Sequence, residues 1–298
     1  MRYLLIYNPN SGKGKIKRYL NYIEKKVNEF CSTYKILQTS CKEDISKFIL
    51  GYGEDFDVVV ICGGDGTISE AVNAIASLKK KPKLAILPTG TVNDIAHNFN
   101  IPRNLKKAIS LIFEGSSFSC DCIKVNDRYG LYVMGAGIFT ETSYTTSQRS
   151  KKIWGRLAYA FHGIKKIFKT KNVDLKFNAN GQNLTTKTPL FLLINSRYVA
   201  GFKINKTNIC DDGKVLLAIL TTDKDHPRFI DLCRIAKLFL KGTDSVNKKF
   251  IIKKDVSSLE IDAKQTINFN LDGELFQAKR LQINIKNKFI DIIVPKNN

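Results

Sequence analysis

Short apolar runs alternate with helix-like stretches along the first part of the chain. The apolar runs, which have the length and composition of strands, are residues 2–8, 33–39, 57–62 and 83–87. Helical periodicity covers residues 16–30, 42–52 and 68–78 between them. The third run, DVVVIC, is apolar throughout, as expected for a strand buried on both faces of a parallel sheet. Residues 1–124 are therefore predicted to form a doubly wound α/β domain with a mostly parallel sheet.

The pattern changes after Cys122. Short alternating segments separated by Gly, Asn and Asp predict an all-β, sandwich-like domain over residues 125–286. These segments are residues 190–194, 214–220, 258–261, 267–271 and 281–285, and helical segments at 151–169 and 228–241 interrupt them. The terminal strand at 289–294 can pair in either domain, so residues 287–298 can belong to the first one.

The size of the chain agrees with this division. A chain of 298 residues exceeds the usual size of one domain, which favours two domains that share a cleft, with one large domain as the alternative. No apolar run is long enough for the core of a signal peptide or for a membrane span. Seven cysteines, an odd number without a Cys-x-x-Cys pair, indicate reduced thiols in a cytoplasmic protein. The three histidines lack the spacing of zinc ligands.

The net charge limits the kinds of molecule that the protein is expected to bind. The chain carries 48 Lys and Arg against 27 Asp and Glu, a formal charge of +21, which favours a nucleic acid, an acidic membrane or a nucleotide. Charge alone does not choose between these partners. A nucleic-acid-binding protein is one alternative, although the sequence shows no helix-turn-helix, zinc-finger or RNP-type signature.

Glycine-rich loops follow three of the predicted strands. The first, NPNSGKGK at residues 8–15, lets backbone N–H groups approach phosphate oxygens beside a helix N-terminus, but it is not a Walker A loop. An ordinary strand-to-helix turn explains this loop equally well. Because the carboxyl ends of neighbouring parallel strands meet in one crevice, the three loops are expected to share a site.

The second and third loops carry carboxylates. GGDGT at residues 63–67 isolates Asp65 among three glycines, where it can hold Mg²⁺ through water, while Thr67 can cap the next helix or bind phosphate. The alternative is a turn with a capping aspartate. PTGTVND at residues 88–94 places Asp94 at the end of the next strand, and there Thr91 or Asn93 can cap a helix that begins near Asp94.

These three motifs, in this order and spacing, resemble the diacylglycerol kinase catalytic-domain family, and within it the soluble bacterial lipid kinases that are similar to sphingosine and ceramide kinases. The resemblance implies ATP and Mg²⁺ as cofactors, an ATP-binding α/β domain and a β-sandwich domain that receives the lipid. It implies that Asp65 and Asp94 organise the catalytic Mg²⁺. The residues implied in nucleotide binding are Asn8, Asn10, Ser11, Gly12, Thr39, Gly63, Gly64, Asp65, Gly66, Thr67, Ile68, Ser69 and Thr91.

Beyond residue 124 the resemblance rests on two short motifs. Asp272 and Glu274, in LDGE, lie where the family keeps its proton acceptor, and Glu274 is the favoured acceptor. Asp272-Gly273 also predicts a type I′ hairpin turn, which is compatible with that role. Asp212, with the backbone of Ile209 and Lys214, lies where the family holds a structural metal, but Asn208 and Cys210 depart from the commoner bacterial pattern there.

The predicted helix at 151–169 is basic and amphipathic. It either rests on an anionic membrane or packs its apolar stripe on the sandwich core. The leading hypothesis is therefore an ATP- and Mg²⁺-dependent lipid kinase, cytoplasmic and peripherally membrane-associated, that converts diacylglycerol to phosphatidic acid. An NAD kinase, which has a similar GGDGT loop, is the enzymatic alternative. Assembly of the chain into a homodimer is a separate possibility.

Overall fold

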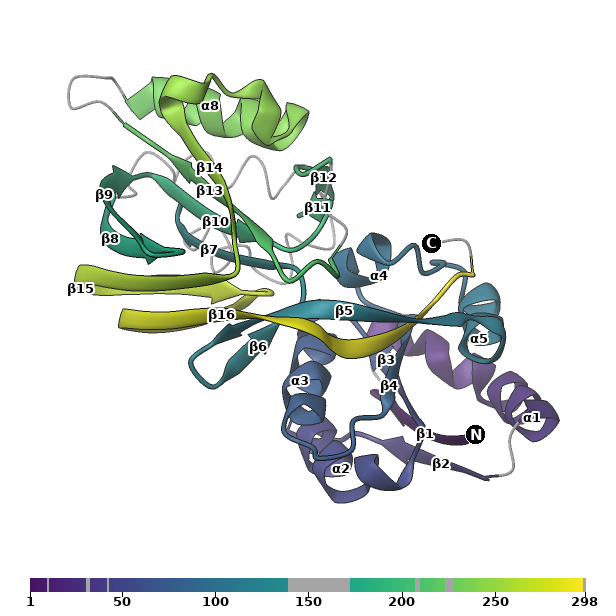
Figure 1. The fold of residues 1–298 in the computed structure, drawn as a ribbon. Helices are drawn as coiled ribbons and strands as arrows, with labels where there is room; N and C mark the ends of the chain where they lie inside the picture. The colour runs from purple at the N-terminus through teal and green to yellow at the C-terminus, as the bar shows by residue number, and fades with distance from the viewer. Residues whose placement is uncertain are drawn as a thin grey trace. The chain divides into compact units, whose positions relative to one another are not determined.

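The computed structural model describes residues 1–9, 11–30, 33–41, 43–138, 172–206, 210–222 and 228–296. The predicted basic helix at 151–169, Asn10 and Ile209 lie outside these residues. The described chain divides into two compact units (Figure 1). Unit 1 comprises Met1–Cys122, Arg128–Leu131 and Lys286–Asn298, and unit 2 comprises Ile123–Asp127 and Tyr132–Ile285.

Unit 1 contains a parallel sheet in the order β4-β3-β1-β2. Its strands are β1 (Arg2–Tyr7), β2 (Thr33–Gln38), β3 (Val58–Gly63) and β4 (Lys83–Pro88). The last part of β16 (Glu274–Val294) adds a further parallel strand beside β4, with Ile292 opposite Leu84. Every residue of β3 is buried, as expected for a central strand covered on both faces.

Helices cover both faces of this sheet. The α-helices are α1 (Leu20–Phe30), α2 (Asp44–Tyr52), α3 (Asp65–Ala76), α4 (Asp94–Asn98) and α5 (Leu105–Glu114), and the 3₁₀ helices are η1 (Ser11–Tyr19) and η2 (Gly53–Asp55). The pair α2 and α3 lies on one side of the sheet, and α1 and α5 lie on the other (Figure 1). The predicted doubly wound α/β fold is confirmed.

Two predicted helix starts were wrong. The helix expected at residues 16–30 is an α-helix only from Leu20, because the 3₁₀ helix η1 precedes it. Gly14 within η1 has φ of 71°, which regular right-handed helix does not contain. The helix expected from residue 68 begins at Asp65, so most of the GGDGT motif is its first turn.

Unit 2 is built from antiparallel strands in the order β14-β13-β10-β7-β15-β16, and β8 pairs with both β15 and β9. Their bounds are β7 (Val133–Gly137), β8 (Val173–Ala179), β9 (Gln182–Thr188), β10 (Leu190–Ile194), β13 (Val215–Leu220), β14 (Ile251–Val256) and β15 (Ser258–Leu271). A two-stranded hairpin joins β11 (Tyr198–Val199) and β12 (Phe202–Lys203). The predicted antiparallel, β-rich second region is confirmed.

Alternating side chains of these strands form the core of unit 2. Phe177, Leu217, Ile261 and Phe269 belong to one buried cluster, so side chains from several of these antiparallel strands share a common core. The helix α8 (Arg228–Lys241), with the bounds that its periodicity predicted, is followed by η3 (Thr243–Ser245) and η4 (Lys248–Phe250). In the part of the chain that the structure describes, no helix has both the length and the apolar composition needed to cross a membrane.

Long strands replace several short predicted ones. The segments expected at 258–261 and 267–271 form the single strand β15, whose pairing with β16 shifts register between Asp262 and Ile267. The segments at 281–285 and 289–294 both belong to β16. The connecting residues are mostly polar, which suggested a loop, but they continue the strand, and Ala263 among them is buried in the core. The remaining strands, β5 (Ser116–Val125) and β6 (Arg128–Gly130), pair with each other.

Candidate functional site

The first turn of α3 begins directly where β3 ends. Gly64 is the N-cap and provides no side-chain capping bond. The N–H groups of Thr67 and Ile68 donate to the carbonyl oxygen of Gly64, at 3.0 and 3.1 Å. The N–H groups that precede them in the turn therefore lie at an uncapped helix N-terminus with its positive partial charge. Such a terminus favours an anion.

Glycines are needed here because two loops touch through their backbones. A Cβ atom at Gly90 would lie 2.5 Å from Gly64 Cα and 2.6 Å from Asn93 Oδ1. A Cβ atom at Gly63 would lie 2.4 Å from the side chain of Thr67. At Gly66, by contrast, a Cβ atom would meet no atom within 4 Å. Packing therefore excludes a Cβ atom at Gly63 and Gly90 and leaves only a tight fit at Gly64, 3.1 Å from Gly90 Cα, whereas Gly66 leaves open space at the first turn of α3.

Asp65 joins the second loop to the third. Its Oδ1 accepts a 2.9 Å hydrogen bond from the N–H of Ile95 in the first turn of α4. Its other oxygen, Oδ2, has no hydrogen-bond partner among the residues that the structure describes. Asp65 is half-buried, and Asp94, which begins α4, is buried at 3% exposure. The two carboxylates that the sequence singled out therefore lie on adjoining helix N-termini.

Asn93 supplies a further acceptor beside them. Its backbone is left-handed, with φ of 56°, and its Nδ2 donates to the carbonyl oxygen of Gly90 at 2.8 Å. Its Oδ1 is buried and has no hydrogen-bond partner among the described residues. Buried acceptors without a donor are rare and call for an explanation, such as a bound ligand or water. A helix does start at Asp94, as expected, but the Asn93 side chain does not cap it.

The first loop reaches the third through two hydroxyl groups. Ser11 Oγ lies 2.8 Å from Thr89 Oγ1, and the N–H of Ser11 donates to the carbonyl oxygen of Asn8. Thr39, buried at the end of β2, donates its N–H to the carbonyl oxygen of Tyr7. The ends of β1, β2, β3 and β4 are thus joined by direct hydrogen bonds or contacts, as the parallel order predicts. Sequence reasoning had assigned no role to Thr89 or Ile95.

The other residues predicted to bind the nucleotide differ in how deeply they are buried. Ile68 and Ser69 are inside α3 with buried side chains, and Ser69 accepts a bond from Asn73 through its carbonyl oxygen. Thr91 is exposed. Thr67 lies within α3, so it does not cap that helix. Gly12 is in η1, and Asn10 lies outside the described residues. The nucleotide roles of these residues stay predictions.

The LDGE motif forms the predicted hairpin between β15 and β16 in unit 2. Asp272 and Gly273 both have positive φ, 50° and 94°, as a type I′ turn requires, and Leu271 pairs with Glu274. Asp272 is buried, and its Oδ1 accepts from the N–H groups of Tyr132 and Val133, each at 3.0 Å. Glu274 is half-buried. Asp272 therefore ties the hairpin to β7, while Glu274 is partly open to solvent.

Asp212, which is predicted to hold a structural metal, lies in a local turn. Asp212 is exposed, and its Oδ1 accepts a 3.0 Å hydrogen bond from the N–H of Lys214, two residues later. Ile209, the third predicted contributor, lies outside the described residues. Among the residues that are described, no group of three or more His, Cys, Asp or Glu side chains is arranged to hold a metal ion.

Cys62 lies one residue before the GGDGT motif but is chemically inert. The thiol is buried in β3, and burial raises its pKa well above the ordinary range because it disfavours the charged thiolate. A thiol that stays protonated is a poor nucleophile. The chemistry of these loops therefore rests on oxygen and backbone N–H groups.

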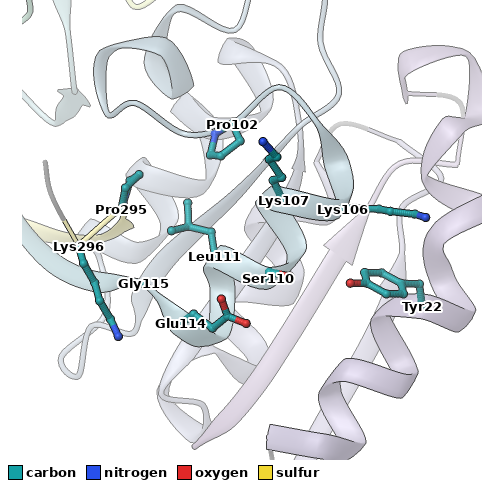
Figure 2. Close-up of a pocket in the computed structure, with 10 residues that line it drawn as sticks. All are labelled: Tyr22, Pro102, Lys106, Lys107, Ser110, Leu111, Glu114, Gly115, Pro295 and Lys296. Carbon is teal, nitrogen blue, oxygen red and sulfur yellow. The ribbon is translucent and has the colours of Figure 1, made fainter.

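A pocket of about 520 Å³ lies elsewhere in unit 1, beside α5 (Figure 2). Its charged side chains are Lys106, Lys107, Glu114 and Lys296, with Tyr22 facing them from α1. The remaining lining residues are Pro102, Ser110, Leu111, Gly115 and Pro295. None of the strand-end loop residues is among them, so this pocket is separate from the arrangement described above.

Gly90→Ala should destabilise the protein. The added Cβ would overlap Gly64 Cα, and backbone atoms cannot move aside cheaply. Overpacking of this kind costs about 1–3 kcal/mol in the free energy of unfolding. Thermal unfolding should show the loss as a lower Tm. The control is Gly51→Ala, which meets open space inside α2 and should hold or raise Tm. An unchanged Tm for Gly90→Ala would contradict the described contact.

Comparisons with known proteins relate this chain to one family. The family model for the diacylglycerol kinase catalytic domain matches residues 2–125. The chain is 33% identical to a diacylglycerol kinase of Staphylococcus carnosus (strain TM300), over 98% of this chain and 95% of the relative. It is 32% identical to a diacylglycerol kinase of Staphylococcus aureus (strain MRSA252), over 98% and 92%. A solved candidate diacylglycerol kinase from Bacillus anthracis str. Sterne superposes with a TM-score of 0.82 at 25% identity, covering 98% of this chain and 95% of that chain.

Proposed function

Because the chain belongs to the diacylglycerol kinase family, we propose that it transfers the γ-phosphoryl group of ATP to the hydroxyl of diacylglycerol, forming phosphatidic acid. Family membership makes it a lipid kinase, that is, a phosphotransferase with an alcohol acceptor. ATP as donor, Mg²⁺ as cofactor and diacylglycerol as acceptor are the parts that we propose. Phosphoryl transfer asks a protein chiefly to position the reactants and to neutralise charge.

The observation that carries the ATP proposal is the uncapped first turn of α3. Its N–H groups need acceptors, and Gly66 leaves their approach open. The contact between Gly64 and Gly90 fixes the third loop against this turn. We propose that phosphate oxygens of ATP accept from these N–H groups, with Ser11, Thr39 and Thr91 adding hydroxyl donors. Backbone donors held by a rigid sheet edge need little rearrangement when an anion binds.

The oxygen atoms of the same loops fit Mg²⁺. Asp65 Oδ2 and Asn93 Oδ1 have no hydrogen-bond partner among the described residues, and Asp94 lies beside them. Carboxylate and amide oxygens are the donors that this ion takes, often through water. Bound there, Mg²⁺ would neutralise charge on the phosphate oxygens. We propose that Asp65 and Asp94 hold it, with Asp65 kept in place by the N–H of Ile95.

Glu274 is proposed as the acceptor of the proton from the lipid hydroxyl. Its carboxylate is half-buried at the start of β16, in a hairpin tip that the left-handed turn makes short and rigid. Asp272 is proposed to position this tip, because its Oδ1 is occupied by two N–H groups of the segment that enters β7. A general base acts only if it is held within reach of the proton that it removes.

A direct assay tests the proposal. Purified protein is incubated with labelled ATP and Mg²⁺, and with dispersions of diacylglycerol, monoacylglycerol, a sphingoid base or phosphatidylglycerol, or with NAD as a soluble acceptor. We expect phosphate transfer to diacylglycerol, with phosphatidic acid identified by mass spectrometry. Transfer to another lipid only would contradict the proposed substrate, and transfer to NAD alone would overturn the lipid assignment.

Gly66→Ala separates nucleotide binding from stability. The new methyl group meets no protein atom within 4 Å, and alanine is favoured over glycine inside a helix by up to about 1 kcal/mol, so Tm should hold or rise. The same methyl group would stand where phosphate is proposed to approach, so the KM for ATP should rise on the order of tenfold. Steady-state kinetics and thermal unfolding measure both effects. An unchanged KM would place the phosphates away from this turn.

A further inference from the structure

The helix α8 carries an apolar stripe on its solvent side. Phe229, Cys233, Ala236 and Leu240 are exposed and recur at four-, three- and four-residue spacing, which places them along one face of the helix. Phe229 is 64% exposed and Leu240 is 71% exposed, the highest values among the large hydrophobic residues of the described chain. Water-facing stripes of this kind mark surfaces that bind something apolar.

The opposite face of α8 holds the helix to unit 2. Asp231, Ile235 and Leu238 are buried, and Phe239 packs edge-on against Phe202 with ring centroids 6.1 Å apart. Arg234 bonds Asp231 at 3.3 Å and stacks 3.5 Å from the ring of Phe250. The stripe is therefore the outer side of a firmly anchored helix, and its exposure does not arise from poor packing of α8.

Positive charge accompanies the stripe. Residues 228–254 contain eight Lys and Arg and two Asp and no Glu. Both aspartates are paired within unit 2, Asp231 with Arg234 and Asp244 with Lys253. Lys237 and Lys241 on α8, and Lys248 and Lys249 on η4, are exposed. The charge that faces solvent around the stripe is therefore positive, which complements an anionic partner.

We infer that the exposed face of α8 is a docking surface for an anionic lipid bilayer, with Phe229 and Leu240 entering the interface and Lys237 and Lys241 contacting the head groups. The inference rests on the proposed function, because an enzyme that phosphorylates diacylglycerol must reach a substrate within a membrane. A helix with one apolar face and flanking lysines is the pattern of interfacial helices. Each lysine near an anionic surface adds attraction that salt weakens. Figure 1 shows α8 at one end of unit 2.

Vesicle co-sedimentation in the absence of ATP tests this surface. The full chain should bind vesicles of phosphatidylglycerol and phosphatidylcholine, and bind pure phosphatidylcholine vesicles weakly. Phe229→Ser with Leu240→Ser should weaken binding to the anionic vesicles by about tenfold or more. The matched control is Leu50→Ser, since Leu50 is also exposed, at 54%, but lies on α2 in unit 1. Equal binding of the double variant and wild type would overturn the inference.

A second measurement reports on contact rather than affinity. Cys233 lies in the middle of the stripe and is exposed, so it can carry an environment-sensitive fluorophore once Cys31, Cys41 and Cys210 are replaced by serine. Anionic vesicles should shift its emission to the blue as the probe leaves water. No shift while the protein co-sediments would overturn the inference, because another surface would then contact the lipid.

Two further measurements distinguish a membrane-docking surface from a dimer interface and from a failure of the kinase proposal. If the double variant changed the protein from dimer to monomer in size-exclusion chromatography and still bound vesicles, the stripe would be an interface between copies, and the inference would be overturned. The kinase proposal is judged independently, on a short-chain, water-soluble diacylglycerol. The double variant should phosphorylate that substrate at the wild-type rate, whereas failure of the wild type to phosphorylate any lipid would sink the kinase proposal alone.

Discussion

Asp65→Asn is expected to lower kcat by about 10²–10³-fold while the fold stays intact. Turnover and stability are affected differently because the wild-type carboxylate both accepts a hydrogen bond and carries a negative charge. Its Oδ1 accepts the N–H of Ile95, and an asparagine Oδ1 can still accept that bond at 2.9 Å. Its negative charge, which we propose holds Mg²⁺ near the phosphates, is lost entirely. Asparagine therefore keeps the link between the second and third loops and removes only the charge.

The measurements are kcat with saturating ATP and lipid, its dependence on Mg²⁺ concentration, and Tm. Asp55→Asn is a matched control, since Asp55 is an exposed aspartate of the same unit in η2, away from the strand-end loops. It should change neither kcat nor Tm. Near-normal turnover of Asp65→Asn at saturating Mg²⁺ would remove Asp65 from the proposed metal site. A matching fall in Tm would show instead that the charge serves the fold.

The convergence of the loops in unit 1 was predictable because it follows from strand order alone. Parallel strands with loops at their carboxyl ends must bring those loops to one edge, and the Ser11–Thr89 and Gly64–Gly90 contacts lie there. The turn at Asp272-Gly273 was predictable for a similar reason, because a two-residue Asp-Gly link between strands requires positive φ at both residues.

What the sequence did not reveal depends on contacts between distant residues. The partners of Asp272 are the N–H groups of Tyr132 and Val133, about 140 positions earlier, and no local pattern names them. The unbroken course of β15 across Asp262 to Ile267 depends on its neighbours β8 and β16, whose pairing overrides the polar composition of that stretch. The regular spacing of Leu105, Ala108, Ile109 and Ile112 is a local signal for α5, although this helix was not among those predicted.

The proposed division of labour in the LDGE hairpin predicts two different kinds of variant. Glu274→Gln should lower kcat by about 10²–10⁴-fold, because an amide cannot take the proton from the lipid hydroxyl. The affinity for ATP and Tm should stay near wild type. Asp272→Ala should instead lower stability by about 2–4 kcal/mol, because it leaves the N–H groups of Tyr132 and Val133 buried without their acceptor.

Asp272→Asn distinguishes positioning from catalysis. Asparagine tolerates the left-handed backbone at φ of 50° and can still accept from both N–H groups, so it should recover most of the stability that alanine loses. If Asp272 only positions the hairpin, kcat should recover with it, whereas Glu274→Gln stays inactive at every pH because its missing group is the base itself. An Asp272→Asn variant that is as stable as wild type but as inactive as Glu274→Gln would move the proton acceptor to Asp272. Full turnover by both Asp272→Asn and Glu274→Gln would place the acceptor outside this hairpin.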